Sequence, residues 1–301
     1  MSIEKRVFVS LDEFCPHQCR YCFTYDIPRL RERTIEEIVN SIENDTFDVI
    51  YISQKNDNFS NPYKGMELTR QLFRKYKTNV FIITRTVFDK KQLRELDELS
   101  KEVNDAGKMM FVAVSINAID SISICENPDL VATPMRRISF IKELSAIGLH
   151  PILMLRPVFP SEVIPVAECE KLIEATSNDV SCVVSSGLGV NDSILSRLGM
   201  KESDFSYKEN QEYLQGAIEC EIKFVNVEKE LAALHSPYPF CFCFGSGNSS
   251  YMAIKSFVRN SLLSTSSTSS ISLAPSYGSS QIAAGISSRA DLVFFTSSRS
   301  S

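Results

Sequence analysis

Three cysteines near the start of the chain carry its clearest chemical signal. Cys15, Cys19 and Cys22 form a CxxxCxxC pattern directly after an alternating apolar segment at residues 6–11. Thiolates are the preferred ligands of iron–sulfur clusters, and one short loop with three of them holds three corners of a cubane and leaves one iron open. The pattern therefore predicts a 4Fe-4S cluster with an open coordination position.

A zinc loop is the alternative that uses the same residues. A closed structural zinc site needs four ligands and is usually built from paired CxxC motifs. His17 is the nearest candidate for a fourth ligand, but it lies between the first two cysteines. A zinc-stabilised interaction module is accordingly the weakest interpretation that stays open.

The run CPHQCRYC at residues 15–22 resembles the signature of the radical S-adenosylmethionine (SAM) superfamily, which has an aromatic residue directly before the third cysteine. The resemblance implies that the reduced cluster cleaves SAM to methionine and a 5'-deoxyadenosyl radical, which abstracts a hydrogen atom from a substrate. It also implies adenine contacts from Tyr21 and from the backbone near Phe23, and an external one-electron reductant such as flavodoxin or ferredoxin. An iron–sulfur electron-transfer protein without SAM chemistry remains an alternative.

The elements that position this loop follow from the hydrophobic periodicity. Period-two or continuous apolar runs predict six strands, at residues 6–11, 47–53, 79–84, 110–116, 150–156 and 180–185. Helical patterns separate them, and two of these patterns open on predicted capping boxes, Thr34 with Glu37 and Asp89 with Gln92.

This alternation predicts βα units and a parallel sheet, so the fold class is α/β. A partial (β/α)6 TIM-like barrel is what the superfamily resemblance adds, because a doubly wound sheet fits the same alternation. In both architectures, ligands collect at the carboxyl ends of the strands. The residues near those ends that suit the amino, carboxylate and ribose groups of SAM are Ser53, Gln54, Arg85, Ser115 and Arg156.

A narrower resemblance, over residues 6–190, is to the spore photoproduct lyase branch of the superfamily. It is carried by YIS at 51–53, NPYKGMELTR at 61–70, IITR at 82–85, VSI at 114–116 and GLHPILM at 148–154. The branch implies that a serine after strand two, a basic residue after strand three and a serine on strand four hold SAM. These roles fall on Ser53, Arg85 and Ser115.

Two departures from that branch argue against assigning the lyase reaction to this chain. The glycine-rich GGE-type segment of the superfamily is replaced by SQKN at residues 53–56. The hydrogen-donating cysteine of the lyase aligns with Tyr51, whose phenol can also donate a hydrogen atom, and Cys125 is a second candidate donor. A lyase-like DNA-repair enzyme is therefore the alternative, and a different radical SAM reaction is the expectation.

The overall composition bears on the partner and the location. The chain has 301 residues and a formal net charge of −5, which gives no general basic surface for a nucleic-acid backbone. A small-molecule or peptide substrate is thus favoured over a nucleic acid. Neither an apolar run of about 18 residues nor a leader pattern is present, so we expect no membrane span and a cytoplasmic protein with reduced cysteines.

The composition changes toward the C-terminus. We expect a catalytic domain at residues 1–235 and a C-terminal extension at 236–301, which is serine-rich and of a composition that favours flexibility from residue 246. Cys241 and Cys243 would supply two ligands of an auxiliary cluster if Cys220 or Cys182 joined them. Burial as small apolar residues is the simpler interpretation of these cysteines.

Overall fold

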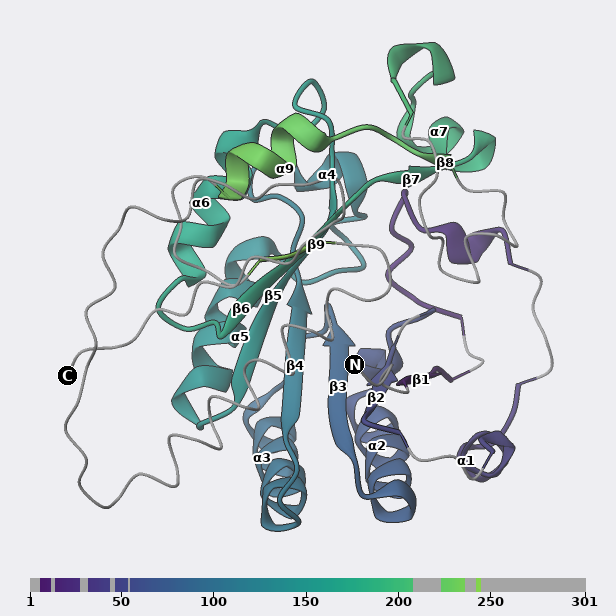
Figure 1. The fold of residues 1–301 in the computed structure, drawn as a ribbon, viewed down its shortest axis with the longest axis vertical. Coiled ribbons are helices and arrows are strands. Elements are labelled where there is room, and N and C mark those ends of the chain that lie inside the picture. The colour runs from purple at the N-terminus through teal and green to yellow at the C-terminus, as the bar shows by residue number, and fades with distance from the viewer. Residues whose placement is uncertain are drawn as a thin grey trace, which may run out of the picture.

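The structure is a computed structural model, and it describes residues 6–11, 14–27, 32–43, 47–53, 55–207, 223–235 and 242–244. Six strands pair in chain order into one parallel sheet, and a seventh strand joins its far edge (Figure 1). They are β1 (Arg6–Val9), β2 (Val49–Ile52), β3 (Asn79–Thr84), β4 (Met110–Ser115), β5 (His150–Val158), β6 (Cys182–Gly187) and β9 (Phe242–Phe244). A separate antiparallel pair is formed by β7 (Gly189–Val190) and β8 (Lys223–Phe224).

Helices follow most of the strands of the sheet. They are α1 (Ile35–Ser41), α2 (Pro62–Tyr76), α3 (Lys90–Asp105), α4 (Ile122–Cys125), α5 (Pro134–Ala146), α6 (Val166–Thr176), α7 (Asp192–Leu198) and α9 (Glu228–His235). Local sequence sets where two of them begin, since both predicted capping boxes form, Thr34 with Glu37 at α1 and Asp89 with Gln92 at α3. Each box satisfies backbone N–H groups that the first helical turn leaves without partners.

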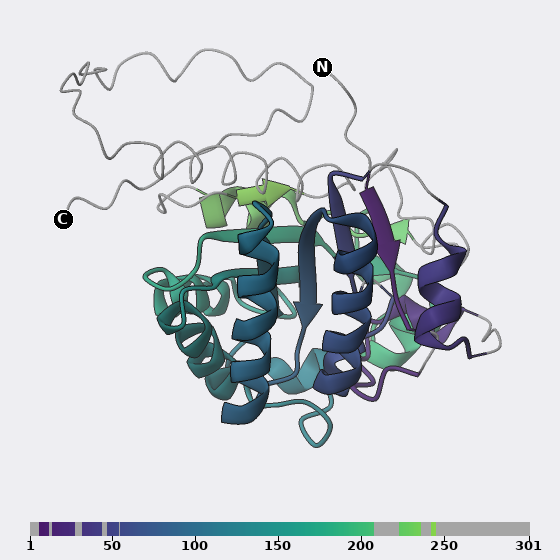
Figure 2. The same cartoon turned by 90° about the horizontal axis from the view of Figure 1, so that it is seen from below.

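The strand order decides between the two parallel architectures. A doubly wound sheet reverses its order at a switch point, whereas this sheet runs from β1 to β6 without a reversal. Helices α2, α3, α5 and α6 lie along one side of the strands (Figures 1 and 2). A large apolar core that includes Leu72, Leu99, Ile141 and Leu172 fills the space between helices and sheet. The predicted α/β partial barrel is therefore confirmed.

The inner face of the sheet carries a row of rings across five neighbouring strands. The parallel register aligns one residue from each strand, in the order Phe8, Tyr51, Phe81, Phe111 and His150. The ring centroids of successive members lie 5.2, 4.7, 6.5 and 6.4 Å apart. Rings at these separations pack against one another, so the row lines the inner face below the carboxyl ends of the strands.

Some predictions concern residues outside the described ranges, namely those for Gln54, Cys220, Cys241 and the segment beyond residue 245. The sheet itself includes β9, which pairs with β6 and lies beyond residue 235. No helix in the described part of the chain is long and apolar enough to cross a membrane.

Candidate functional site

The cysteine loop, residues 14–22, connects the carboxyl end of β1 to a 3-10 turn at Phe23–Tyr25. Cys15, Cys19 and Cys22 are all free thiols, and Cys19 is the most deeply buried of the three. Burial raises the pKa of the Cys19 thiol to about 12. Burial also raises the pKa of Cys15, although backbone N–H groups of Asp57 and His17 act against that rise. A bound metal centre is what would hold such buried thiols as thiolates.

The three thiols of the cysteine loop are donors of the kind that an iron–sulfur cluster takes. Within the described ranges, no three His, Cys, Asp or Glu side chains converge on a position for one metal ion. A zinc site needs that convergence, whereas a cubane binds each thiolate through a different iron. The donor set of the cysteine loop therefore suits an iron–sulfur cluster.

His17 is committed to the protein and does not complete a zinc site. Its Nε2 donates to Oδ2 of Asp57 at 2.8 Å, and its Nδ1 lies 3.2 Å from the carbonyl oxygen of Leu130. Asp57 also accepts hydrogen bonds from Thr84 Oγ1 at 3.0 Å and from the backbone N–H of Arg85 at 2.7 Å. Burial opposes ionisation of Asp57, but the hydrogen bond and charge of His17, with the other donors, lower its pKa below the ordinary value. This pair ties the cysteine loop to the end of β3.

Arg85 belongs to a buried ion network under the cysteine loop. Its Nε lies 3.2 Å from Oε1 of Glu126, and Nη1 of Arg137 donates to the same oxygen at 3.1 Å. A second bond joins Nη2 of Arg137 to the other oxygen of Glu126. Glu126 is 1% exposed and Arg137 is fully buried. Two guanidinium groups therefore share one carboxylate, which leaves a net positive charge beside Cys19.

Tyr21 links the cysteine loop to β4 and β5. Its hydroxyl accepts a hydrogen bond from Arg85 and donates to Oδ1 of Asn117 at 2.9 Å. Nδ2 of Asn117 donates onward to the carbonyl oxygen of Pro157 at 2.8 Å. The Tyr21 ring meets Phe159 edge-on at 5.8 Å. Burial raises the pKa of Tyr21 well above its ordinary value, so the phenol stays protonated and can donate this bond.

The two predicted SAM-binding serines lie on the inner face, at the ends of β2 and β4, which β3 separates in the sheet. Their side follows from Tyr51 and Ala113, which point inward two positions earlier on the same strands. Ser53 follows β2 with a φ of +78°, and its hydroxyl accepts from the backbone N–H of Asn58 at 3.0 Å. Ser115 is 2% exposed, and its carbonyl oxygen accepts from Arg137 at 2.5 Å. Both serines thus border the lumen on the same side of the sheet as the cysteine loop.

Phe23 and Arg156 form different kinds of hydrogen bond, Phe23 through its backbone and Arg156 through its side chain. Phe23 begins the 3-10 turn, and its carbonyl oxygen accepts from the backbone N–H of Asp26 at 2.9 Å. Arg156 lies near the carboxyl end of β5, two positions beyond the inward-facing Met154, and its Nε donates to Oγ of Ser186 at 2.7 Å. The guanidinium of Arg156 therefore lies on the inner side of the barrel.

The two candidate hydrogen donors occupy different environments. Tyr51 is 4% exposed and stacks on Phe81 at 4.7 Å, inside the row of rings. Cys125 is fully buried among apolar neighbours that include Phe159, and burial raises the pKa of its thiol above the ordinary value. Its carbonyl oxygen accepts from the backbone N–H of Arg20 at 2.9 Å, which braces the cysteine loop. Tyr51 faces the lumen and Cys125 does not; their donor roles stay predictions.

Arg197 is a site residue that sequence reasoning missed. It lies in α7, yet its Nε donates to the carbonyl oxygen of Arg20 at 2.9 Å and its Nη2 to that of Cys22 at 2.8 Å. Its Nη1 binds Oδ1 of Asp26 at 3.2 Å. No local sequence signal marks this arginine, since its partners precede it by more than 170 residues.

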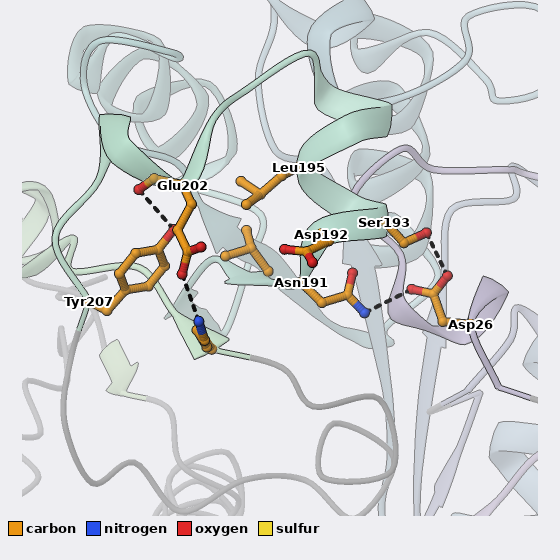
Figure 3. A pocket seen from close by; sticks show the side chains of 9 residues that line it. Asp26, Asn191, Asp192, Ser193, Leu195, Glu202 and Tyr207 are labelled. Carbon is orange, nitrogen blue, oxygen red and sulfur yellow. Dashed lines mark hydrogen bonds and ion pairs between the residues drawn. The ribbon is translucent and has the colours of Figure 1, made fainter.

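Asp26 anchors the same contact from the cysteine-loop side. Asn191 and Ser193 both point toward its carboxylate (Figure 3), with donor–acceptor distances of 3.1 and 2.8 Å. Burial alone would raise the pKa of Asp26, but the hydrogen bonds from Arg197, Ser193 and Asn191 lower it. The start of α7 is thereby fixed against the segment that follows Cys22.

A pocket of about 390 Å³ opens on the far side of this contact, between α7 and the β7–β8 pair (Figure 3). Two of its three lining acids form ion pairs within the protein, Asp26 with Arg197 and Glu202 with Lys223 at 2.6 Å. The lining includes none of the three cysteines. The cysteine loop and the barrel lumen are therefore the better candidate site.

Comparisons with known proteins agree with this geometry. The family model described as the Radical SAM superfamily matches residues 9–178. Among solved structures, a spore photoproduct lyase complexed with dinucleoside spore photoproduct is similar with a TM-score of 0.50 and 13% identity, over 73% of this chain and 69% of that chain. SuiB of Streptococcus suis bound to S-adenosylmethionine is similar with a TM-score of 0.50 and 12% identity, over 81% of this chain and 51% of SuiB. Comparison with curated protein sequences found no match.

Proposed function

Since the chain belongs to the radical SAM superfamily, we propose that it is an enzyme that binds a 4Fe-4S cluster through Cys15, Cys19 and Cys22 and acts on SAM. One observation carries this proposal: three free thiols in a CxxxCxxC pattern share a single loop at the carboxyl end of β1. When bound, the cluster and SAM supply a 5'-deoxyadenosyl radical, which abstracts a hydrogen atom from the substrate.

The chain's own residues have the task of holding this loop and the SAM molecule. We assign SAM contacts to Ser53 and Ser115 on the inner face, and to Tyr21 in the loop. Arg85 donates to Tyr21 and pairs with Glu126, so its part is to fix the Tyr21 phenol and to place positive charge near Cys19. That charge favours anionic thiolates, because Arg85 lowers the pKa of Cys19 against the effect of burial.

The lumen has the second task, which is exclusion. A carbon radical reacts with many C–H groups, so the substrate must be held close while water and other donors are kept out. Phe81 and Phe111, in the row of rings, are at most 1% exposed. We therefore place the substrate above the row of rings, at the carboxyl ends of the strands.

The substrate class follows from charge. With a net charge of −5, the chain has no general attraction for nucleic acid. We infer a small molecule or a peptide as substrate, and an external one-electron reductant such as flavodoxin or ferredoxin.

Anaerobic purification and reconstitution test the proposal. We expect a brown protein with about four irons per chain and 5'-deoxyadenosine formation from SAM after reduction. Alanine at Cys15, Cys19 or Cys22 should abolish both. Cys169→Ala is the matched control, since Cys169 is also a buried free thiol but lies on α6 in the helix-side core. Full iron content in the loop variants, or a zinc-loaded colourless protein, would refute the proposal.

A further inference from the structure

Arg156 is a half-buried cation on the inner face, and its pairing differs from that of the other arginines there. Ile152 and Met154 of β5 face the lumen, so the alternation of the strand directs Arg156 to the same side. On β6, Val184 faces the lumen and is aligned with Met154. Ser186 stands two positions further along β6, where its hydroxyl accepts from Nε of Arg156 at 2.7 Å.

The terminal nitrogens of Arg156 have no recorded acceptor within the described part of the chain. Its one hydrogen bond is the bond from Nε to Ser186, and it forms no ion pair with a described carboxylate. The other buried arginines contrast with it, because Arg85 and Arg137 both bind Glu126. Burial lowers the pKa of Arg156, with the phenol of Tyr51 acting against that effect. Arg156 is therefore a partly desolvated cation without a counter-ion among the described residues.

Such an arrangement is unfavourable for folding and favourable for binding. A buried charge without a partner destabilises the native state, and the penalty is relieved when an anion arrives. A guanidinium held at Nε by a hydroxyl still presents its two terminal nitrogens as a planar fork. That fork matches the two oxygens of a carboxylate or a phosphate.

The place of Arg156 in the sheet separates it from the cysteine loop. The loop begins after β1, and β2, β3 and β4 lie between β1 and β5. The SAM carboxylate has to reach the open iron at the loop, whereas Arg156 stands at the opposite part of the sheet. Tyr51, which interacts electrostatically with Arg156, belongs to the row of rings.

We propose that Arg156, held by Ser186, binds an oxyanion of the substrate, a carboxylate or a phosphate, in the barrel lumen. This proposal rests on the proposed function, because it assumes that the lumen receives the substrate. It narrows the substrate to an acidic small molecule or to a peptide with an acidic or phosphorylated group.

Direct binding to the cluster-loaded, SAM-saturated protein tests it, with inorganic phosphate and succinate as probes in calorimetric titrations. We expect one probe molecule to bind per chain, with the dissociation constant raised about ten-fold or more in Arg156→Met and less in Ser186→Ala. Arg156→Lys should restore binding only in part, because it keeps the charge but lacks the planar fork. Equal binding of both probes to wild type and Arg156→Met would overturn the proposal. So would a ten-fold loss of SAM affinity in Arg156→Met, since the anion would then be the carboxylate of SAM.

A stability measurement tests whether misfolding, and not loss of the guanidinium, weakens probe binding in Arg156→Met. We expect Arg156→Met to leave the apoprotein Tm unchanged or to raise it, because the variant removes an unpaired and partly buried charge. Arg137→Met, the matched control, should lower the Tm because it leaves Glu126 with one partner fewer. A clear Tm drop in Arg156→Met would contradict the unpaired state. Failure of the wild type to cleave SAM would refute the proposed function and is measured separately.

Discussion

The guanidinium of Arg197 donates to the carbonyl oxygen of Cys22 at 2.8 Å, although 175 residues separate them in the sequence. The same side chain holds the carbonyl oxygen of Arg20 at 2.9 Å. A loop that presents three ligands to a cluster must keep its backbone in one conformation, and these bonds fix the carbonyls on both sides of Tyr21. The geometry of the cysteine loop thus depends on α7.

Replacing Arg197 with Met should loosen the loop while leaving the fold intact. A hydrogen bond to a charged donor contributes about 1.5–3 kcal/mol, and this variant loses two that hold the loop. We expect EDTA to remove iron from reconstituted Arg197→Met several-fold faster than from wild type, with an unchanged circular dichroism spectrum. Arg136→Met, on the exposed Arg136–Glu143 pair, is the control and should match wild type. Equal rates in all three proteins would rule out a positioning role for Arg197.

The carboxylate of Glu126 should be among the most sensitive positions outside the cysteine loop. Glu126→Gln removes the negative charge shared by Arg85 and Arg137, and breaking a buried ion pair in this way costs about 3–5 kcal/mol. Urea unfolding of the apoprotein measures the change in the free energy of unfolding. For Glu143→Gln, whose pair is exposed, we expect a loss below about 1 kcal/mol. A similar small loss for Glu126→Gln would mean that the network is not buried as described.

The Asp57 carboxylate predicts a specific pH dependence. The pKa of Asp57 is lowered in the folded state. Its stabilising contribution to the free energy of unfolding is therefore fully present above the pKa of an aspartate in the unfolded chain, about 3.9. It is lost as the pH falls through the lower folded pKa, where the carboxylate binds a proton in both states. We expect Asp57→Asn to destabilise the apoprotein at pH 7, and the difference from wild type to shrink below about pH 4. A difference that stays constant from pH 7 to pH 3 would contradict this.

Replacing Gly65 with alanine should destabilise the protein, which is the opposite of the usual effect of this substitution in a helix. Ala normally stabilises a helix interior by about 1 kcal/mol relative to Gly. A Cβ at position 65 of α2 would lie 2.7 Å from a ring carbon of Phe59 and 2.9 Å from the carbonyl oxygen of Asn58. We therefore expect Gly65→Ala to destabilise the protein by about 1–3 kcal/mol in urea unfolding. Lys64→Ala, on the exposed side of the same turn, should be near neutral, and a stabilised Gly65→Ala would show that α2 can shift away from Phe59.

Local features of the chain were predictable where their causes are local. The strand at residues 79–84 is an apolar run with polar flanks, and it forms between the predicted residues. The capping box of Asp89 with Gln92 needs only the residues of one helical turn, so its geometry is contained in its sequence. β9 was not predicted, because three residues in a strand carry too little periodicity to be recognised.

The sequence by itself determined which atoms can hold a cluster, since the spacing of Cys15, Cys19 and Cys22 is a property of one loop. Only the tertiary structure decided that His17 is bound to Asp57 and Leu130. It also decided that Arg85 forms an ion pair with Glu126, whereas Arg156, on the same inner face, has no described carboxylate beside it. In the sequence, Arg85 and Arg156 both stand near the carboxyl end of a predicted strand, and nothing there distinguishes them. Their difference arises because strands and helices far apart in the chain fold together, and a cation's partner is set by that packing.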